Sequence, residues 1–297
     1  MRVAVFGAEG QLGSDVCARF ESNGDDVRRL RHVDADVTSL SSVCRALSEF
    51  QPQVVVNSAA FHNVEKCQQD GAHAFAVNSS GAQNVSIAAA EMGAVVFYVS
   101  TDYVFGGSKR RPYVEEDLPD PLNVYGVSKL AGEHLVRNAN PRHFILRTSA
   151  IYGVNPCRAK SGLNFVELML KLGRERDEVK VVDSEFVSPT PAADIARQIV
   201  KLSQCDAFGL YHATAEGSCS WFEFAREIFE MAGLGARLKT ATAGDFPAKV
   251  SRPAYSVLEN QALKMIGLNE FQHWRDGLRS YLAASQQHPR FAETSPV

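Results

Sequence analysis

The sequence predicts an α/β protein with a doubly wound parallel sheet and a smaller C-terminal region. Two observations carry this prediction. Short apolar runs alternate with longer helical patterns through the first 150 residues, and this alternation breaks down afterwards. Apolar strands separated by helices are typical of a parallel sheet that is covered on both faces. With 297 residues, the chain is long enough for such a sheet and a smaller companion.

Five strands and four helices are predicted in residues 1–150. The strands are short runs rich in apolar residues: Val3–Phe6, Val27–Leu30, Val54–Val56, Val95–Val99 and Phe144–Leu146. The helices carry helical spacing: Leu12–Asn23, Leu40–Phe50, Ala72–Met92 and Val127–Asn138. Gly24 and Gly93 end the first and third helices, and Thr38 or Ser39 is placed to cap the second.

The second half continues with less regular elements. They are a helix over Leu163–Glu175, a strand over Val179–Val182, a helix over Ala192–Leu202, a strand over Gly209–Ala213 and a helix over Trp221–Met231. We expect the strand and helix near residues 179–213 to return to the sheet. The rest of residues 151–297 is expected to build a smaller region over the carboxyl edge of the sheet, and the polar tail after residue 286 is expected to be disordered.

Composition excludes several classes of protein. The formal net charge of −3 gives no electrostatic reason to expect a nucleic-acid partner. No apolar run approaches the roughly 18–20 residues that span a bilayer, and the N-terminus lacks the apolar region of a signal peptide. The six cysteines are scattered and predict no disulfide framework and no metal site. We therefore expect a cytoplasmic protein, with a homodimer as the assembly to test.

A glycine-rich turn follows the first predicted strand and opens the first predicted helix. Its sequence is Gly7-Ala-Glu-Gly10-Gln-Leu-Gly13. Glycine is needed where a backbone turns sharply or approaches a pyrophosphate, and a helix N-terminus offers free N–H groups to phosphates. This context predicts a Rossmann-type dinucleotide-binding domain over residues 1–150 and a mainly substrate-binding region over residues 151–297. Gly7, Gly10, Gln11, Leu12 and Gly13 are expected at the cofactor.

The end of the second strand indicates which dinucleotide is bound. Enzymes that use NAD usually place an acidic residue there, to bind a ribose hydroxyl. Here the segment reads Val27-Arg28-Arg29-Leu30-Arg31-His32. Arg31, with Arg29 as a second candidate, suits the 2′-phosphate of NADP(H), which we favour. NAD(H) remains the alternative, because Asp34 and Asp36 follow closely and could serve the ribose or the adenine.

Tyr125 and Lys129 form a YxxxK motif at the start of a predicted helix. Residues four apart lie on one helix face, so an ammonium would lie beside the phenol. The ordinary phenol pKa of about 10 is high for acid–base work near neutrality, and a nearby ammonium is expected to lower it. The lysine is also expected to hold the nicotinamide ribose. Ser100 and Thr101 follow the predicted strand Val95–Val99 at the carboxyl edge of the sheet, where a hydroxyl could orient a substrate carbonyl.

These motifs belong to a wider resemblance. The chain resembles the extended short-chain dehydrogenase/reductase superfamily and, within it, the dTDP-4-dehydrorhamnose reductase family. The segments that carry it are Val99-Ser-Thr-Asp-Tyr-Val-Phe105, Pro112-Tyr113 with Glu115, Pro121-Leu-Asn-Val-Tyr-Gly-Val-Ser-Lys-Leu-Ala-Gly-Glu133, Arg147-Thr-Ser149, Ser188-Pro-Thr190, Gly209-Leu-Tyr-His212 and Ser251-Arg-Pro253. The resemblance extends to about residue 282, and its Pro121–Glu133 block is highly specific.

The resemblance implies roles for the residues of the active site. Thr101 matches the catalytic hydroxyl, Tyr125 the proton donor and Lys129 its partner. Asp102 and Tyr103 match positions that contact the sugar.

Further positions match the ligand-binding sites of the family. Asp36 and Val37 match positions beside the adenine, and Ala59 and Ala60 match the turn along the cofactor. Arg252, in Ser-Arg-Pro, is a candidate for the diphosphate of the substrate.

The resemblance also implies an activity, the NAD(P)H-dependent reduction of a nucleotide-linked 4-keto-6-deoxy sugar. The sugar that the family reduces is dTDP-4-dehydro-L-rhamnose, and the product is dTDP-L-rhamnose. Similar dehydratases carry an acidic residue directly after Thr-Asp, where this chain has Tyr103, so a reductase is favoured. Two alternatives stay open. One is another sugar-nucleotide reductase or epimerase, and the other is a non-catalytic NADP-binding subunit similar to the β subunit of methionine adenosyltransferase.

Some positions depart from the family pattern near the expected substrate pocket. The tryptophan that usually follows Arg-Thr-Ser is Ala150, and Tyr152 is the nearest aromatic residue that could replace it. The loop over residues 153–162 is longer than usual, and the glycine before Pro189 is Ser188. These departures leave open which keto sugar is the substrate.

Overall fold

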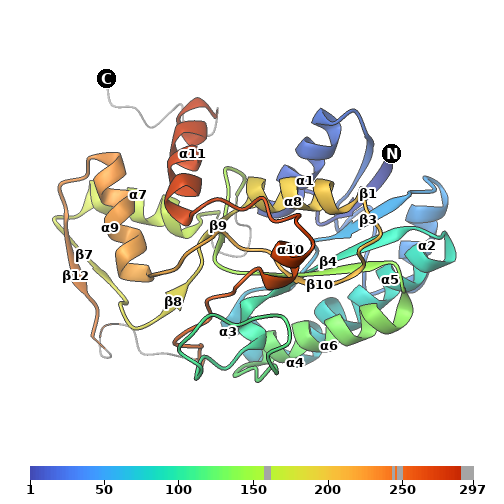
Figure 1. The fold of residues 1–297 in the computed structure, drawn as a ribbon, viewed down its shortest axis with the longest axis horizontal. Helices are drawn as coiled ribbons and strands as arrows, with labels where there is room; N and C mark the ends of the chain where they lie inside the picture. Colours follow the sequence, from blue (N-terminus) through green and yellow to red (C-terminus); the bar gives the residue numbers. More distant parts are fainter. Residues whose placement is uncertain (157–161, 243–244, 246–249, 289–297) are drawn as a thin grey trace.

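The centre of the molecule is a six-stranded sheet in the order β10-β5-β4-β3-β1-β2, with all neighbours parallel (Figure 1). The computed structural model describes every residue except 157–161, 243–244, 246–249 and 289–297. The strands are β1 (Arg2–Phe6), β2 (Asp26–Leu30), β3 (Val54–Asn57), β4 (Val95–Thr101), β5 (His143–Thr148) and β10 (Gly209–His212). This confirms the predicted Rossmann-type α/β fold.

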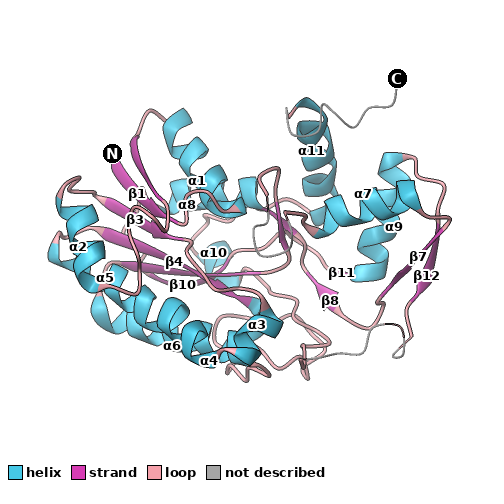
Figure 2. Ribbon diagram, turned by 180° about the vertical axis from the view of Figure 1, so that it is seen from behind, coloured by secondary structure: helices cyan, strands magenta, loops and turns pink. Residues whose placement is uncertain are grey.

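Helices cover both faces of the sheet (Figure 2). One face carries α1 (Gln11–Ser22) and α8 (Ala192–Leu202), and the other carries α2 (Leu40–Ser48), α5 (Ala82–Glu91) and α6 (Val124–Ala139). Alternate residues of each strand enter the two cores, as Val5 and Phe6 do on opposite sides of β1. Two buried faces require apolar residues at successive positions, which explains the continuous apolar runs of the sequence.

The chain returns to the sheet after building its second region. Helix α8 packs against α1, and β10 pairs with β5, as predicted for this part of residues 179–213. The strand predicted near residue 179 does not return. It forms β7 (Glu178–Val181), which pairs in parallel with β12 (Arg237–Thr240) outside the main sheet. Its alternation of buried and exposed residues suits a two-stranded sheet with one covered face, and this is the physical reason for the difference.

The helix predicted over residues 72–92 is divided by a wider turn. It consists of α4 (Gly71–Phe75), the π-helical turn η1 (Ala76–Gly81) and α5. Within η1, the carbonyl of Asn78 accepts a hydrogen bond from the Tyr98 hydroxyl at 2.7 Å, from a strand of the sheet. A side chain that takes a carbonyl of the helix in this way is one cause of a π-turn.

The second region has its own apolar core, which α7 (Phe165–Glu175), α9 (Trp221–Ala232) and α11 (Trp274–Gln287) surround. Its remaining elements include β6 (Ile151–Tyr152), β8 (Phe186–Val187), β9 (Thr190–Pro191) and β11 (Cys219–Ser220), whereas α10 (Gln261–Met265) packs against β10 of the main sheet. The domain boundary at residue 150 stays a prediction. The tail predicted after residue 286 lies outside the described residues from position 289 onward. No helix in the described part of the chain has the length and apolar character to cross a membrane.

Candidate active site

The glycine turn between β1 and α1 is shaped by close contacts between main-chain atoms. Gly7 has φ +73°, a left-handed conformation that favours glycine. A Cβ atom on Gly13 would lie 2.2 Å from the Gly7 carbonyl oxygen, and a Cβ atom on Gly7 would lie 2.9 Å from the Ala59 nitrogen. Gly10 caps α1 without a side-chain hydrogen bond to its first N–H groups. The turn therefore has the form that lets a pyrophosphate reach a helix N-terminus.

Two other residues predicted at this turn point their side chains away from it. Leu12 is 7% exposed and belongs to the core between the sheet and α1. The side-chain amide of Gln11 lies within hydrogen-bonding distance of the main chain at Gly153. Both residues are thus placed to offer main-chain N–H groups to a cofactor, while Gln11 also joins the turn to the second region.

A cavity of about 790 Å³ opens at the end of β2, beside the glycine turn. Its lining includes Arg31 and Arg29 together with Glu9 and Asp34. The Arg31 guanidinium donates to both Asp34 carboxylate oxygens at 2.7 and 2.9 Å, and this hydrogen bonding holds the pKa of Asp34 well below its usual value. Arg29 instead binds Glu21 on α1 at 2.9 and 2.7 Å. A phosphate group would fit the cationic lining, in competition with Asp34 for Arg31.

The positions expected beside the adenine and at the turn along the cofactor follow β2 and β3. Asp36 accepts hydrogen bonds from the N–H and hydroxyl of Thr38, and these bonds lower its pKa. Val37 is buried under η1. Ala59 and Ala60 follow β3 and are half-buried, so they line a surface that a ligand could reach.

Thr101, Tyr125 and Lys129 meet at the carboxyl edge of the sheet. Thr101 ends β4, and Tyr125 lies in the first turn of α6, whose N-cap is Asn123. The Tyr125 phenol shares a hydrogen bond with the Thr101 side chain. Gly126 allows the start of α6 to lie against the main chain at Tyr103, because a Cβ atom on Gly126 would lie 2.2 Å from the Tyr103 carbonyl oxygen. Lys129 follows one turn later and is 1% exposed. Thr101 and Tyr125 are therefore neighbours, and the Lys129 ammonium lies one helical turn further on, over the Tyr98 ring.

The protonation of this cluster differs from the prediction. Burial raises the pKa of Tyr125, and the hydrogen bond with Thr101 only limits the rise. Burial lowers the pKa of Lys129 to about 7, against the opposing effect of the Glu133 carboxylate. The expected lowering of the phenol pKa by Lys129 is therefore wrong for this structure, because the loss of hydration dominates both groups. Tyr125 is held as a neutral phenol at physiological pH.

Asp102 is placed differently from the sugar contact that the resemblance implies. It is 4% exposed and accepts hydrogen bonds from the hydroxyls of Thr101 at 3.1 Å, Ser149 at 2.9 Å and Ser256 at 2.5 Å. Burial raises its pKa to about 6, and the three hydroxyls oppose that rise. With both oxygens occupied, Asp102 orients Thr101 rather than facing a ligand. Sequence reasoning missed Ser149 and Ser256, although Ser149 lies in a family block.

Tyr103 and Arg252 lie on the same side of the cluster. The Tyr103 and Tyr125 rings are 6.0 Å apart between centroids and meet edge to face. Arg252 forms an ion pair with Glu65 of α3 (Val64–Gln69), and it interacts electrostatically with Tyr103. The structure thus brings a cation close to the aromatic side of the predicted pocket, and it adds Glu65, which the sequence analysis did not single out.

Tyr152 does not replace the missing tryptophan. It is 1% exposed and packs between Phe224 and Tyr281 in the core of the second region. Ala150 has a left-handed backbone with φ 44°, so the chain turns between the end of β5 and Tyr152. This turn directs the Tyr152 side chain into the core. The sequence alone did not show which way that side chain points.

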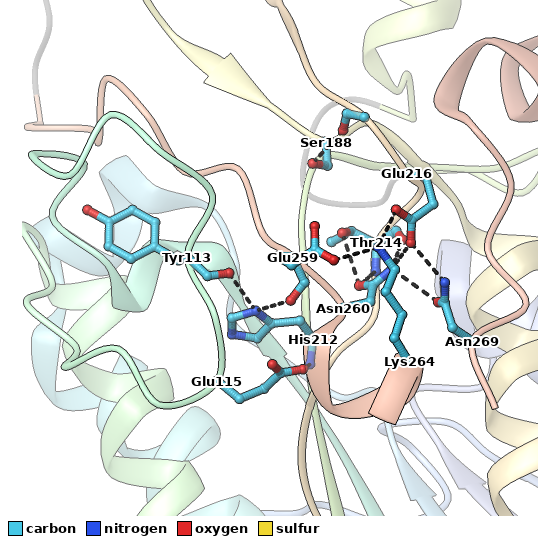
Figure 3. A network of polar contacts seen from close by, with 11 residues as sticks. Tyr113, Glu115, Ser188, His212, Thr214, Glu216, Glu259, Asn260, Lys264 and Asn269 are labelled. Atoms are coloured by element: carbon cyan, nitrogen blue, oxygen red, sulfur yellow. Dashed lines mark hydrogen bonds and ion pairs between the residues drawn. The ribbon is translucent and has the colours of Figure 1, made fainter. Parts of the chain in front are cut away.

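Some family residues hold the second region to the sheet rather than line the cluster (Figure 3). Nδ1 of His212 lies 3.1 Å from the carbonyl oxygens of both Tyr113 and Glu259. Because both neighbours are acceptors, Nδ1 must carry the proton. The main-chain N–H of His212 donates to the Glu115 carboxylate at 2.8 Å. Burial lowers the pKa of the His212 imidazole to about 3. This neutral histidine fixes the segment around residue 259 against β10.

No group of three or more His, Cys, Asp or Glu side chains in the described ranges is placed to hold a metal ion. The structure does provide a glycine turn, an arginine-rich cavity of mixed charge at the end of β2, and the hydroxyl and phenol of Thr101 and Tyr125 at the carboxyl edge.

Comparisons with known proteins agree with this geometry. The spore coat polysaccharide biosynthesis protein SpsK of Bacillus subtilis is 39% identical over 95% of this chain and 96% of its own. A dTDP-4-dehydrorhamnose reductase of Sinorhizobium fredii is 36% identical over 94% and 96% of the two chains. The structure of the Bacillus anthracis dTDP-4-dehydrorhamnose reductase in complex with NADP has a TM-score of 0.90, is 36% identical and covers 95% of this chain and 99% of that one.

The family model described as RmlD substrate binding domain matches residues 1–287. This match spans the sheet, the candidate site and the second region. The chain therefore belongs to the RmlD substrate-binding family, a family of sugar-nucleotide 4-keto reductases that includes homologous dTDP-4-dehydrorhamnose reductases.

Proposed function

We propose that this protein reduces the 4-keto group of a nucleotide-linked 6-deoxy sugar, with dTDP-4-dehydro-L-rhamnose as substrate and dTDP-L-rhamnose as product. The observation that carries the proposal is the pairing of Thr101 with Tyr125 at the carboxyl edge of the sheet, with Lys129 one turn later on the same helix. When bound, a nicotinamide dinucleotide supplies the hydride. The N-terminus of α1 would hold its phosphates, and Lys129 would hold its ribose.

The side chains of this cluster then handle the proton and the developing charge. Tyr125 donates its proton to the substrate oxygen, which suits a phenol that burial keeps protonated. The Thr101 hydroxyl, which donates to Asp102 in the structure, turns its one proton to the same oxygen as negative charge develops there. Tyr103 stands where similar dehydratases have an acidic residue, and a phenol with a pKa raised by burial is a poor substitute for a carboxylate. This difference supports reduction over loss of water.

NADPH oxidation with a panel of nucleotide-linked 4-keto-6-deoxy sugars tests the proposal. We expect turnover with dTDP-4-dehydro-L-rhamnose, with one NADPH oxidised for each sugar reduced. Turnover with a different sugar would correct the substrate, and conversion without net NADPH oxidation would indicate an epimerase. Absence of turnover with every sugar, despite tight NADP binding, would favour the non-catalytic subunit.

Arg31 is proposed to select NADPH by pairing with its 2′-phosphate. Replacing Arg31 with alanine should raise the Michaelis constant for NADPH at least about tenfold, because a charge-assisted hydrogen bond is lost. The constant for NADH should stay within about twofold, since NADH has no phosphate at that position. Steady-state kinetics with both cofactors measure the two constants.

Arg29→Ala is the matched control, because Arg29 lines the same cavity but binds Glu21 through both carboxylate oxygens. It should leave the preference for NADPH unchanged. Equal constants for NADPH and NADH in the unaltered protein, or an equal effect of Arg31→Ala on both cofactors, would contradict the assignment.

Arg252 is proposed to bind the diphosphate of the substrate. Arg252→Glu should raise the Michaelis constant for the nucleotide sugar by about tenfold or more, because it replaces attraction of the diphosphate by repulsion. The constant for NADPH should not move. Arg237→Glu provides a control at an exposed position on β12, away from the cluster. If the two reversals have the same small effect on sugar binding, Arg252 is not a substrate contact.

A further inference from the structure

Lys129 rests on the face of a fully buried tyrosine. Its Nζ atom lies 4.0 Å from the centroid of the Tyr98 ring, and the two side chains are 1% and 0% exposed. An ammonium over an aromatic face is attracted by the negative charge of the ring face, and the attraction is largest where water is excluded. The contact is therefore expected to hold the Lys129 ammonium in place and to favour its protonated form.

The Tyr98 ring is itself held from two sides. Its hydroxyl donates to the Asn78 carbonyl at 2.7 Å, and burial keeps the Tyr98 pKa well above its usual value, so the hydroxyl stays a donor. The Asn78 side chain binds the Phe61 N–H and the Ser128 hydroxyl, at 2.9 and 3.0 Å. The π-turn at Asn78 thus presents a fixed acceptor to the ring.

A glycine on α6 makes room for this arrangement. Gly132 lies three residues after Lys129, on the side of the helix that faces β4. A Cβ atom on Gly132 would lie 2.4 Å from the Tyr98 hydroxyl oxygen and 2.3 Å from the Asn78 carbonyl oxygen. Any other residue would force the helix and the ring apart, and the distance from Lys129 to the ring would change with them.

We propose that Tyr98 is a positioning residue for Lys129, that its ring fixes the ammonium and favours the charged form, and that close packing of the ring against α6 at Gly132 holds it in place. The consequence for catalysis rests on the proposed function, because it requires Lys129 to act in ketone reduction. The contact itself stands independently of the reaction.

The groups around Lys129 raise or lower the pKa of its ammonium. Burial is the main influence and lowers the Lys129 pKa to about 7. Glu133 on α6 and Cys67 on α3 favour the charged form, and Tyr125 lies one turn earlier on α6. The Tyr98 ring on β4 acts in the same direction as Glu133. Without the ring, the ammonium would lose its proton at lower pH.

Two variants separate the ring from the hydroxyl. Tyr98→Leu removes the aromatic face, and Tyr98→Phe keeps it while removing the bond to Asn78. NMR titration of the lysine side chains in 13C-lysine-labelled full-length protein measures the pKa of Lys129, whose signal is the one missing from Lys129→Met. We expect Tyr98→Leu to lower this pKa by about one pH unit and Tyr98→Phe to change it by less than about 0.3. Equal shifts in both variants, no shift, or a rise in Tyr98→Leu would overturn the proposal.

The pH dependence of kcat then tests the link to catalysis. In Tyr98→Leu, the alkaline limb that reports Lys129 should move to lower pH by the same amount as the NMR titration, and Tyr98→Phe should keep the original limb. A merely structural defect would lower kcat equally at all pH values, which would overturn the catalytic part. If the unaltered protein reduces no keto sugar, the proposed function fails, while the NMR titration still decides whether Tyr98 positions Lys129.

Discussion

Replacement of Tyr125 by phenylalanine is expected to lower kcat for keto-sugar reduction by about 10²–10⁴-fold, the usual contribution of a positioned proton donor. The dissociation constant for NADPH should stay within about twofold. Phenylalanine keeps the ring at the start of α6 and removes only the hydroxyl that is bonded to Thr101. Single-turnover kinetics and fluorescence titration with NADPH measure the two quantities.

Tyr103→Phe is the matched control for this change. Tyr103 is also a half-buried phenol and lies 6.0 Å from Tyr125 between ring centroids, yet it gives no proton in the proposed reaction. We expect it to keep kcat within about tenfold. Full activity of Tyr125→Phe would remove the proposed proton donor, and equal losses in both variants would assign the effect to the pocket in general.

Removal of the Glu133 carboxylate is expected to produce the largest loss of stability. Glu133 and Arg147 are 5% and 3% exposed and are joined by two hydrogen bonds of 2.9 and 2.7 Å. Glu133 also accepts from the Ser100 hydroxyl at 2.5 Å. Glu133→Ala leaves the guanidinium buried without its counter-ion, and the free energy of unfolding should fall by about 3–5 kcal/mol. Urea unfolding followed by circular dichroism measures this change.

Two further variants distinguish a buried charge from lost packing. Glu133→Leu combined with Arg147→Met removes both charges while keeping apolar volume, and it should recover much of the loss. Glu227→Ala breaks the more exposed pair with Arg275 and should cost no more than about 1 kcal/mol. If the double variant is as unstable as Glu133→Ala, the loss reflects packing and the argument from charge is wrong.

The parts of the fold that could be predicted are those that local pattern determines. The apolar runs identified the central strands β1, β3, β4 and β5, because a sheet covered on both faces leaves few polar positions within them. The edge strand β2 is less apolar and carries Arg28 and Arg29. Thr101 and Tyr125 could be placed together because one follows a strand at its carboxyl edge and the other opens a helix. Neither inference required knowledge of a partner far along the chain.

The parts that could not be predicted depend on the partner or direction of a side chain. The apolar pattern of β7 resembles that of a sheet strand, and only the position of β12, nearly sixty residues later, decides its pairing. Tyr152 enters the core because Ala150 adopts a left-handed backbone conformation. Alanine rarely adopts this conformation, so the residue type does not predict it. Asp102 receives a hydroxyl from Ser256, and such a distant contact leaves no periodic signal.

The return of the chain to the sheet restricts how this protein could exchange parts with its relatives. Because α8 and β10 come after the first segments of the second region, a single crossover near residue 150 would bring a foreign edge strand and a foreign helix into the sheet. A functional hybrid would need at least two splice points, one on each side of the segment from α8 to β10. Recombination that changes the sugar specificity is therefore expected to exchange two separate stretches of sequence at once. Exchange of only one of them would leave the second region incomplete.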